Sequence, residues 1–301
     1  MKTIKTTLLF CLVTVFSFAS ISTKEKDALK ALYNSTGGQF WTKTWDLNAP
    51  VSNWHGVVIR NDKVVELNLE FNNLTGNLPF EFGDLVNLEK INFFRNNITG
   101  SIPSSIGKLK SLRYLNIAFN KLNGELPHTI TDLASLVSLQ LYMNSIEGTI
   151  PSQIGNLTRL RTLELYNNNL KGSIPASIEK LTNLREFLVS SNNLTGKLPS
   201  SISNLKKLKV LSVFDNNLFG IVPSSIGDLT NLEELVLADN AFYGDLPSEL
   251  ASLTNLKVLL LGNNAFKGDL ASLQDKFPNI RNFDAQNNNS KGSIATLDTE
   301  D

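Results

Sequence analysis

The chain has 301 residues, of which 42% are hydrophobic and 19% are charged, a composition typical of a folded, water-soluble protein. Its 28 basic and 28 acidic side chains give a formal net charge of zero, so composition provides no attraction to nucleic acid, and we expect no nucleic-acid partner. The only cysteine, Cys11, lies in the N-terminal leader. The rest of the chain can therefore form neither a disulfide nor a thiolate metal site.

The first 19 residues have the pattern of a secretory signal peptide. Lys2 and Lys5 precede an apolar run over residues 8–18, and the small residues Ser17 and Ala19 have the spacing that a signal peptidase accepts. The run is too short to span a membrane, and Ser, Thr and Lys follow it. The pattern predicts a signal peptide over residues 1–19 and a secreted or cell-surface protein with no membrane span or anchor.

Residues 20–63 lack the repeat that fills the rest of the chain. Apolar residues at helical spacing follow an acidic start near Glu25, which predicts a helix, and all three tryptophans come soon after it, at Trp41, Trp45 and Trp54. The end of a repeat array needs a cover for its apolar edge. We therefore predict an N-terminal cap over residues 20–63; tryptophans that bind sugars are the alternative.

A pattern of 24 residues then returns ten times over residues 64–292. Its consensus is LxxLxLxxNxLxGxIPxxIGxL, with a glycine at every 24th position from Gly76 to Gly292. Four residues before each glycine stands an asparagine, giving the set Asn72, Asn96, Asn120, Asn144, Asn168, Asn192, Asn216, Asn240, Asn264 and Asn288. A fixed period of this length, without insertions, predicts a solenoid. The remaining residues, 293–301, form a polar C-terminal tail.

The third copy illustrates what each position does. Leu115 and Ile117 alternate with Asn116 and Ala118, so the first pair faces the core and the second faces outward from a short strand. Stacked copies then form a parallel sheet. The asparagines end these strands in a turn, where we expect a buried ladder of amides bonded to the backbone of their own coil and of the next coil.

The outward columns of the first five copies combine amides with aromatic rings. Such groups suit a glycan or a peptide backbone, and they predict a ligand-binding site on the concave face composed of Phe71, Asn92, Phe94, Asn116, Phe119, Gln140, Tyr142, Glu164 and Tyr166. In copies six to nine the same columns present a modest apolar patch of Leu188, Phe214, Val236 and Leu260. Drift on a solvated surface is the alternative for both sets.

Few residues suggest catalysis. Asp215 and Asp239 occupy the same position of adjacent copies and should lie about 5 Å apart, as an acid/base pair, a weak cation site or two solvated aspartates. The two histidines, His55 and His128, are too far apart along the solenoid to cooperate. We therefore predict no catalytic residues, no metal site, no cofactor and no enzymatic activity.

With the run LxGxIPxxIGxLxxL in nearly every copy, the chain resembles the extracellular leucine-rich repeat proteins of the plant-type 24-residue subclass. The region over residues 20–63 resembles the caps of secreted bacterial and algal members, because it lacks the cysteine pair usual in plant receptors. The resemblance implies an α/β fold, a right-handed horseshoe with a parallel sheet on the concave face and short 3-10 or irregular segments on the convex face. It also implies a protein, peptide or polysaccharide as the ligand.

Together these features predict a secreted, non-enzymatic recognition protein that binds its ligand on the concave face. An inhibitor of polysaccharide-degrading enzymes is an alternative that the resemblance suggests. Ice binding is a weaker alternative, because the threonine column of Thr75, Thr99 and Thr195 is interrupted by Asn123, Glu147 and Lys171. The oligomeric state is left open.

Overall fold

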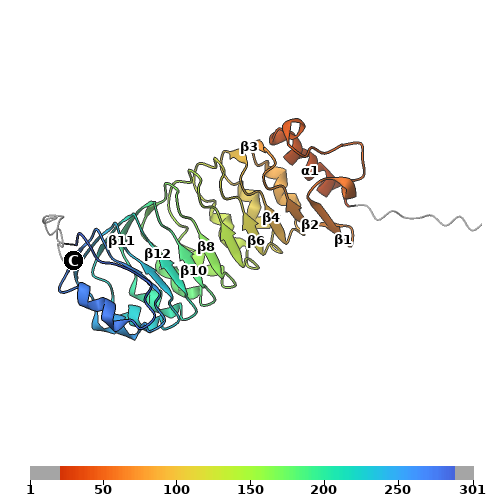
Figure 1. The fold of residues 1–301 in the computed structure, drawn as a ribbon. Coiled ribbons are helices and arrows are strands. Elements are labelled where there is room, and N and C mark those ends of the chain that lie inside the picture. Colours follow the sequence, from red (N-terminus) through yellow and green to blue (C-terminus); the bar gives the residue numbers. More distant parts are fainter. Residues whose placement is uncertain (1–20, 289–301) are drawn as a thin grey trace, which may run out of the picture.

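The computed structural model describes residues 21–288, so the predicted signal peptide and the polar tail lie outside the described residues. The described chain winds as a solenoid with a long sheet on one face (Figure 1). We number its coils from one to ten, each starting with the first leucine position of a repeat, so that coil one begins at Val64 and coil two at Leu88.

The main sheet has eleven strands in the order β1-β2-β4-β6-β7-β8-β10-β12-β14-β16-β18. From β2 onward all neighbours are parallel and paired at an offset of one repeat, as in Leu115 with Leu139, which confirms the predicted parallel sheet. Their bounds are β2 Lys63–Asn68, β4 Lys90–Asn92, β6 Tyr114–Asn116, β7 Ser138–Gln140, β8 Thr162–Glu164, β10 Glu186–Leu188, β12 Val210–Ser212, β14 Glu234–Val236, β16 Val258–Leu260 and β18 Asn282–Asp284.

The first strand of the sheet was not predicted. β1 (Val57–Arg60) pairs antiparallel with β2, and the register shifts by a bulge between Val58 and Ile59. The connecting residues Asn61 and Asp62 both have positive φ, the conformation that a tight two-residue hairpin loop requires. The sheet therefore begins with a hairpin whose first strand belongs to the non-repeat segment and whose second strand belongs to coil one.

Two smaller parallel sheets flank the main one, and the sequence pattern did not indicate them either. They lie just after the ladder asparagines and pair residues 22 apart, as in Thr195 with Asn217. One contains β3 (Thr75–Asn77) and β5 (Asn97–Thr99); the other has the order β17-β15-β13-β11-β9, with β9 Lys171–Gly172, β11 Asn193–Lys197, β13 Asn217–Gly220, β15 Ala241–Asp245 and β17 Ala265–Lys267.

Short 3-10 helices form the face opposite the main sheet, as the resemblance implied. Most start directly after the proline of the repeat, whose fixed φ and missing N–H suit that place. They are η3 Phe80–Asp84, η4 Ser104–Lys108, η5 His128–Asp132, η6 Ile154–Asn156, η7 Ala176–Lys180, η8 Ser200–Asn204, η9 Ser224–Asp228, η10 Ser248–Ser252 and η11 Ala271–Lys276. Between the two faces, aliphatic side chains such as Ile117, Ile130 and Leu133 are completely buried.

The segment before the repeats is built on helix α1 (Thr23–Ser35), followed by η1 (Gly38–Phe40) and η2 (Val51–Asn53). Glu25 is the N3 residue of a capping box with Ser22, and its Oε1 also accepts a hydrogen bond from the backbone N–H of Val64, 3.1 Å away in coil one. Trp45 stacks on Trp54, and its edge meets Trp41. All three tryptophans are buried and donate their indole N–H to backbone carbonyls, so they offer no exposed ring face to a sugar.

The asparagine ladder connects each coil to the one before it. The Nδ2 of Asn168 donates to the carbonyls of Leu165 in its own coil and Leu141 in the preceding coil, and its Oδ1 accepts from Ile146 N–H at 3.0 Å. The expected bonds to the next coil were wrong. The backbone N–H groups at the end of each strand already donate to carbonyls of the next coil, as Leu165 N–H does to Leu188. The groups left for the asparagine at the turn therefore belong to the preceding coil. Asn120 and Asn144 are half-buried, and the other eight are buried.

Candidate functional site

Each coil leaves the main sheet through a residue with a left-handed backbone. The position directly before the ladder asparagine has φ between 49° and 58° in all ten coils: Phe71, Arg95, Phe119, Met143, Asn167, Ser191, Asp215, Asp239, Asn263 and Asn287. Only Gly, Asn and Asp adopt this conformation readily, and other side chains are strained there by about 1–2 kcal/mol. Coils one to four carry large side chains at this position, whereas five of the remaining six carry Asn or Asp.

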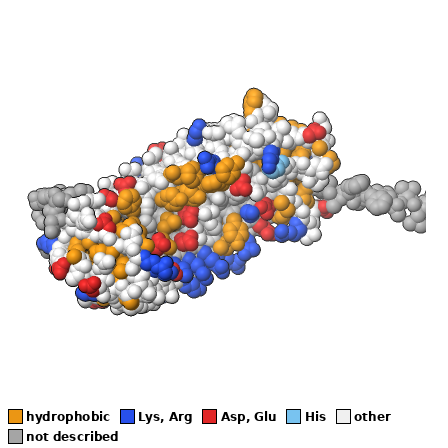
Figure 2. All heavy atoms as spheres, in the orientation of Figure 1, with side chains coloured by type: hydrophobic (Ala, Val, Ile, Leu, Met, Phe, Trp, Pro, Cys, Tyr) orange, Lys and Arg blue, Asp and Glu red, His pale blue; other side chains and the backbone are white. Residues whose placement is uncertain are grey.

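Five aromatic rings in coils one to five form one continuous row, which we call the aromatic stripe: Phe71, Phe94, Phe119, Tyr142 and Tyr166. The first four rings meet edge to face, with centroids 5.4 Å, 5.4 Å and 5.7 Å apart in order along the stripe. The last two stack nearly parallel at 4.4 Å. Figure 2 shows hydrophobic side chains as a band across the face that carries the strands.

The stripe is continuous because coil three uses a different position. Phe94, Tyr142 and Tyr166 occupy one repeat position, which we call the strand column. In coil three this position holds Ala118, which is completely buried. The ring in coil three comes instead from the next residue, Phe119, which contacts both Phe94 and Tyr142 from the left-handed position. Phe71 does the same at the start of the stripe, where the guanidinium of Arg95 lies 5.5 Å from its ring. The two strained phenylalanines thus complete a row that the strand column alone would interrupt.

Much of the stripe is accessible to a ligand. Phe71 is 55% exposed and Phe119 is 38% exposed, while the other three rings are half-buried. Burial, together with the nearby Tyr142 and Glu164, raises the pKa of Tyr166 to about 12. Burial is also the main cause of the raised pKa of Tyr142. Both hydroxyls are therefore protonated at neutral pH and can donate hydrogen bonds.

The amides predicted beside the rings are partly occupied. Asn92 donates to Asn68 Oδ1 at 3.0 Å and to Glu70 Oε2 at 2.9 Å, and Gln140 donates to Glu164 Oε2 at 2.9 Å. Burial raises the pKa of Glu164, although the bond from Gln140 opposes this effect. Asn116 Oδ1 accepts from the backbone N–H of Ala118. These contacts hold the amide column in a fixed orientation next to the stripe.

The other sets of residues that the sequence suggested are less developed. Of the patch in coils six to nine, only Phe214 is exposed, at 36%, and Leu188, Val236 and Leu260 are half-buried. Asp215 and Asp239 occupy the left-handed turn, and Asp239 accepts a hydrogen bond from Asn263 at 2.8 Å. Across residues 21–288, no three His, Cys, Asp or Glu side chains gather as a metal site would require.

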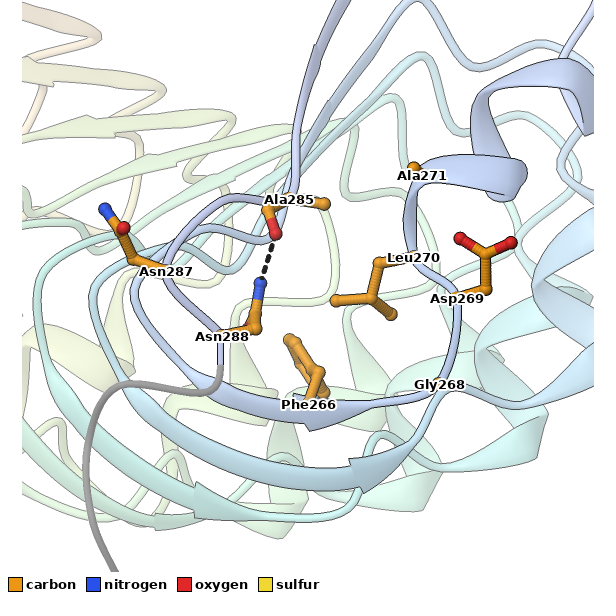
Figure 3. Close-up of a pocket in the computed structure, with 8 residues that line it drawn as sticks. All are labelled: Phe266, Gly268, Asp269, Leu270, Ala271, Ala285, Asn287 and Asn288. Carbon is orange, nitrogen blue, oxygen red and sulfur yellow. Dashed lines mark hydrogen bonds between the residues drawn. The ribbon is translucent and has the colours of Figure 1, made fainter.

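The chain outlines a cavity of about 510 Å³ at the C-terminal end of the described solenoid (Figure 3). It is lined by Phe266, Gly268, Asp269, Leu270, Ala271, Ala285, Asn287 and Asn288, the last of which donates to the carbonyl of Ala285. Asn288 is the last residue that the structure describes, so this cavity borders the end of the described chain. It lies far along the solenoid from the stripe, and we assign no ligand to it.

The repeated coils, the parallel sheet and the 3-10 turns define a leucine-rich repeat protein. A family model described as "Leucine-rich repeat region" matches residues 64–171 and 144–293, more than half of the sequence, so the chain belongs to the leucine-rich repeat family. A search of curated proteins found no match.

Solved structures give more specific likenesses. The ectodomain of the plant membrane receptor kinase GASSHO1/SCHENGEN3 from Arabidopsis thaliana, in complex with CASPARIAN STRIP INTEGRITY FACTOR 2, is 30% identical over 88% of this chain and 32% of its own, with a TM-score of 0.82. The plant peptide hormone receptor RGFR1, in complex with RGF2, is 33% identical over 73% of this chain and 35% of its own, with a TM-score of 0.71. This chain thus spans about a third of the length of either of these solved chains.

A plant ice-binding protein is 24% identical over 88% of each chain, with a TM-score of 0.75, a likeness that shows the fold alone. The chain is therefore related to plant receptor ectodomains and similar in fold to a plant ice-binding protein; its assignment to a bacterial or algal branch stays a prediction. Within residues 21–288, no helix has the length and apolar character needed to cross a bilayer.

Proposed function

We propose that this protein is a secreted, non-enzymatic recognition protein that binds its ligand along the aromatic stripe of coils one to five. The observation that carries the proposal is the continuity of the stripe, including two exposed phenylalanines held in a backbone conformation that disfavours them. Strain of this kind persists at functional sites because function, rather than stability, selects the residue. Coils five and seven to ten carry Asn or Asp at this position, the residues that adopt this backbone readily.

The ligand lies on a surface that is open rather than enclosed. Exposed rings provide large apolar contact areas at small cost in conformational entropy, and the adjacent amides and tyrosine hydroxyls provide hydrogen bonds. The two related receptors were solved in complex with CASPARIAN STRIP INTEGRITY FACTOR 2 and with RGF2. These likenesses support ligand binding by this chain, and the leader pattern of residues 1–19 supports secretion.

The test is a triple substitution within the stripe. The wild-type protein is first applied to an array of glycans and peptides, and the retained probes are then titrated against a Phe94→Ala, Tyr142→Ala, Tyr166→Ala variant. Truncation of a central aromatic anchor typically costs about 2 kcal/mol or more, so we expect the triple variant to lose most of its affinity. Equal binding by wild type and triple variant would refute the placement of the site.

Phe214→Ala is the matched control. Phe214 occupies the same column of the repeat in coil seven, is exposed, and lies outside the stripe. We expect it to leave binding unchanged. Melting curves of all variants check that the solenoid remains folded, which we expect because the substituted side chains point away from the core.

Secretion is tested separately, by the mass of the protein exported from an expressing cell. The exported protein should lack residues 1–19.

A further inference from the structure

Arginines gather along one edge of the main sheet, at the position that follows the first leucine of each repeat. Arg113, Arg161 and Arg185 occupy this position in coils three, five and six, Val137 occupies it in coil four, and Arg159 lies two residues before Arg161; these are four of the chain's seven arginines. Lys209 continues the row in coil seven. Figure 2 shows Lys and Arg side chains concentrated along the lower edge of the face that carries the strands.

Backbone hydrogen bonds place the members of this row in neighbouring coils. Arg161 N–H donates to Val137, Arg185 N–H to Arg161, and Lys209 N–H to Arg185, each at 2.8 Å. Neighbouring strands lie about 4.8 Å apart, so three cationic residues follow one another at that spacing. Like charges on neighbouring strands destabilise a sheet. A protein with zero formal net charge thus maintains a local excess of positive charge.

In coils seven to nine the same column pairs its cationic side chains, Lys209 included, with a carboxylate. It reads Lys209, Glu233 and Lys257, and the two lysines contact the carboxylate at 2.6 Å and 2.5 Å. By contrast, within residues 21–288, no ion pair joins Arg113, Arg159, Arg161 or Arg185 to a carboxylate, although Glu164 and Glu186 lie in nearby columns. The arginines of coils three to six are therefore available to an anion from outside.

We infer that this arginine row binds a linear acidic polysaccharide, laid along the solenoid axis beside the aromatic stripe. Guanidinium groups bind carboxylates through paired hydrogen bonds. Alternate side chains of an extended peptide face opposite ways, so a peptide laid along the row can offer it a carboxylate only at every second residue. A polyuronate instead carries a carboxylate on every sugar, and its hydroxyls suit the amide column that lies between the arginine row and the aromatic stripe.

This inference rests on the proposed function and adds the charge of the ligand to it. The probe is immobilised polygalacturonate, and the matched neutral surface is the same polymer after complete methyl esterification. We expect wild-type protein to bind the acid form more tightly, with affinity falling as salt rises. Equal binding to the ester, or stronger binding to poly-glutamate than to polygalacturonate, would overturn the inference.

The variants are Arg161→Gln with Arg185→Gln, and Arg281→Gln as the control. Arg281 occupies the same column in coil ten, so it tests the same substitution outside the row. We expect the double variant to bind polygalacturonate about tenfold more weakly or worse, since two charge-assisted contacts are lost, and the control to bind as wild type does. A double variant that binds as wild type does would reject the row as a binding site.

Two further measurements keep the result interpretable. Without polysaccharide, the double variant should melt no lower than wild type, because it removes two neighbouring like charges from an exposed edge. The triple variant of the aromatic stripe, tested on the same polymer, separates the two proposals. If binding depends on the arginines and not on the rings, the arginine row is supported and the placement of the site on the aromatic stripe fails. If binding depends on the rings alone, the arginine row is rejected and the placement on the aromatic stripe is supported.

Discussion

The side-chain amide of Asn144 donates a hydrogen bond to the backbone carbonyl of Tyr142, 3.3 Å away. The same amide also reaches the carbonyls of Leu141 and of Ile117 in the preceding coil, both at 3.0 Å. One asparagine therefore joins two coils and fixes the backbone from which a ring of the aromatic stripe projects. The ladder and the candidate site are parts of the same turn.

Removal of a ladder amide should destabilise the solenoid. Asn144→Ala leaves Leu122 N–H without a partner and removes one of the hydrogen bonds to the carbonyls of Ile117, Leu141 and Tyr142, each of which keeps another donor. A buried group left unsatisfied costs about 1–3 kcal/mol. We expect the free energy of unfolding, measured by urea titration, to fall by at least that amount. Asn240→Ala, in coil eight, should cause a similar loss of stability without weakening ligand binding. An unaltered urea midpoint in both variants would contradict this role.

The left-handed turn predicts a clear ranking of substitutions at Asn167, whose φ is 52°. Asn167→Val should lower the free energy of unfolding by about 1–2 kcal/mol, because a branched side chain is strongly disfavoured there. Asn167→Gly serves as the control and should change stability much less, since glycine adopts this backbone freely. Thermal melting of the two variants provides the comparison. Equal melting temperatures would show that the turn relaxes to another conformation.

The tyrosine pair predicts a loss of stability in alkali. The pKa of Tyr166 is raised from 10.0 to about 12 by burial, so between these values the unfolded chain releases the proton more readily than the folded chain does. The stabilising contribution is complete below pH 10 and is lost as the pH rises toward 12. Melting temperatures measured across this window should fall more steeply for wild type than for Tyr166→Phe. Parallel curves would argue against the shifted pKa.

The ion pairs of Glu233 predict a loss of stability at acidic pH. Hydrogen bonds from Lys209 and then Lys257 lower its pKa from 4.5 to about 2, so its contribution to stability is present above pH 4.5 and is lost as the pH falls toward 2. The group is close to solvent, and exposed pairs contribute only about 0.2–1 kcal/mol. Glu233→Gln should therefore flatten the dependence of stability on pH slightly in this window. Carboxyl titration by NMR would detect the shift directly, and a normal midpoint would rule it out.

The period of the sequence was enough to predict the main sheet, because residues that recur every 24 positions must stack in register once each coil buries its leucines. It could not reveal the flanking sheets, which pair residues 22 apart, as in Thr195 with Asn217. The left-handed turn was also invisible: its residues range from Phe71 to Asn287 and include no glycine, so no conserved letter marks it. Only the backbone shows their shared property, a positive φ.

For the candidate site, the strand columns predicted Phe94, Tyr142 and Tyr166, and the neighbouring position added Phe71 and Phe119. Why these five rings form one row could not be inferred, because the row depends on Phe119 reaching across a buried alanine from a strained turn. The arginine row lies outside the strand columns from which the candidate site was predicted. Its signal was present, as arginines at a constant offset from the first leucine of the repeat in coils three, five and six.

The bulge between Val58 and Ile59 in β1 has a consequence for behaviour at high concentration. A parallel sheet with a straight free edge is a template on which another chain can add a strand and begin a fibre. Here the outermost strand runs in the opposite direction, is interrupted after two residues and ends at a charged arginine, Arg60. This end of the sheet therefore resists elongation by a second molecule, and concentrated solutions should not grow cross-β fibrils from it.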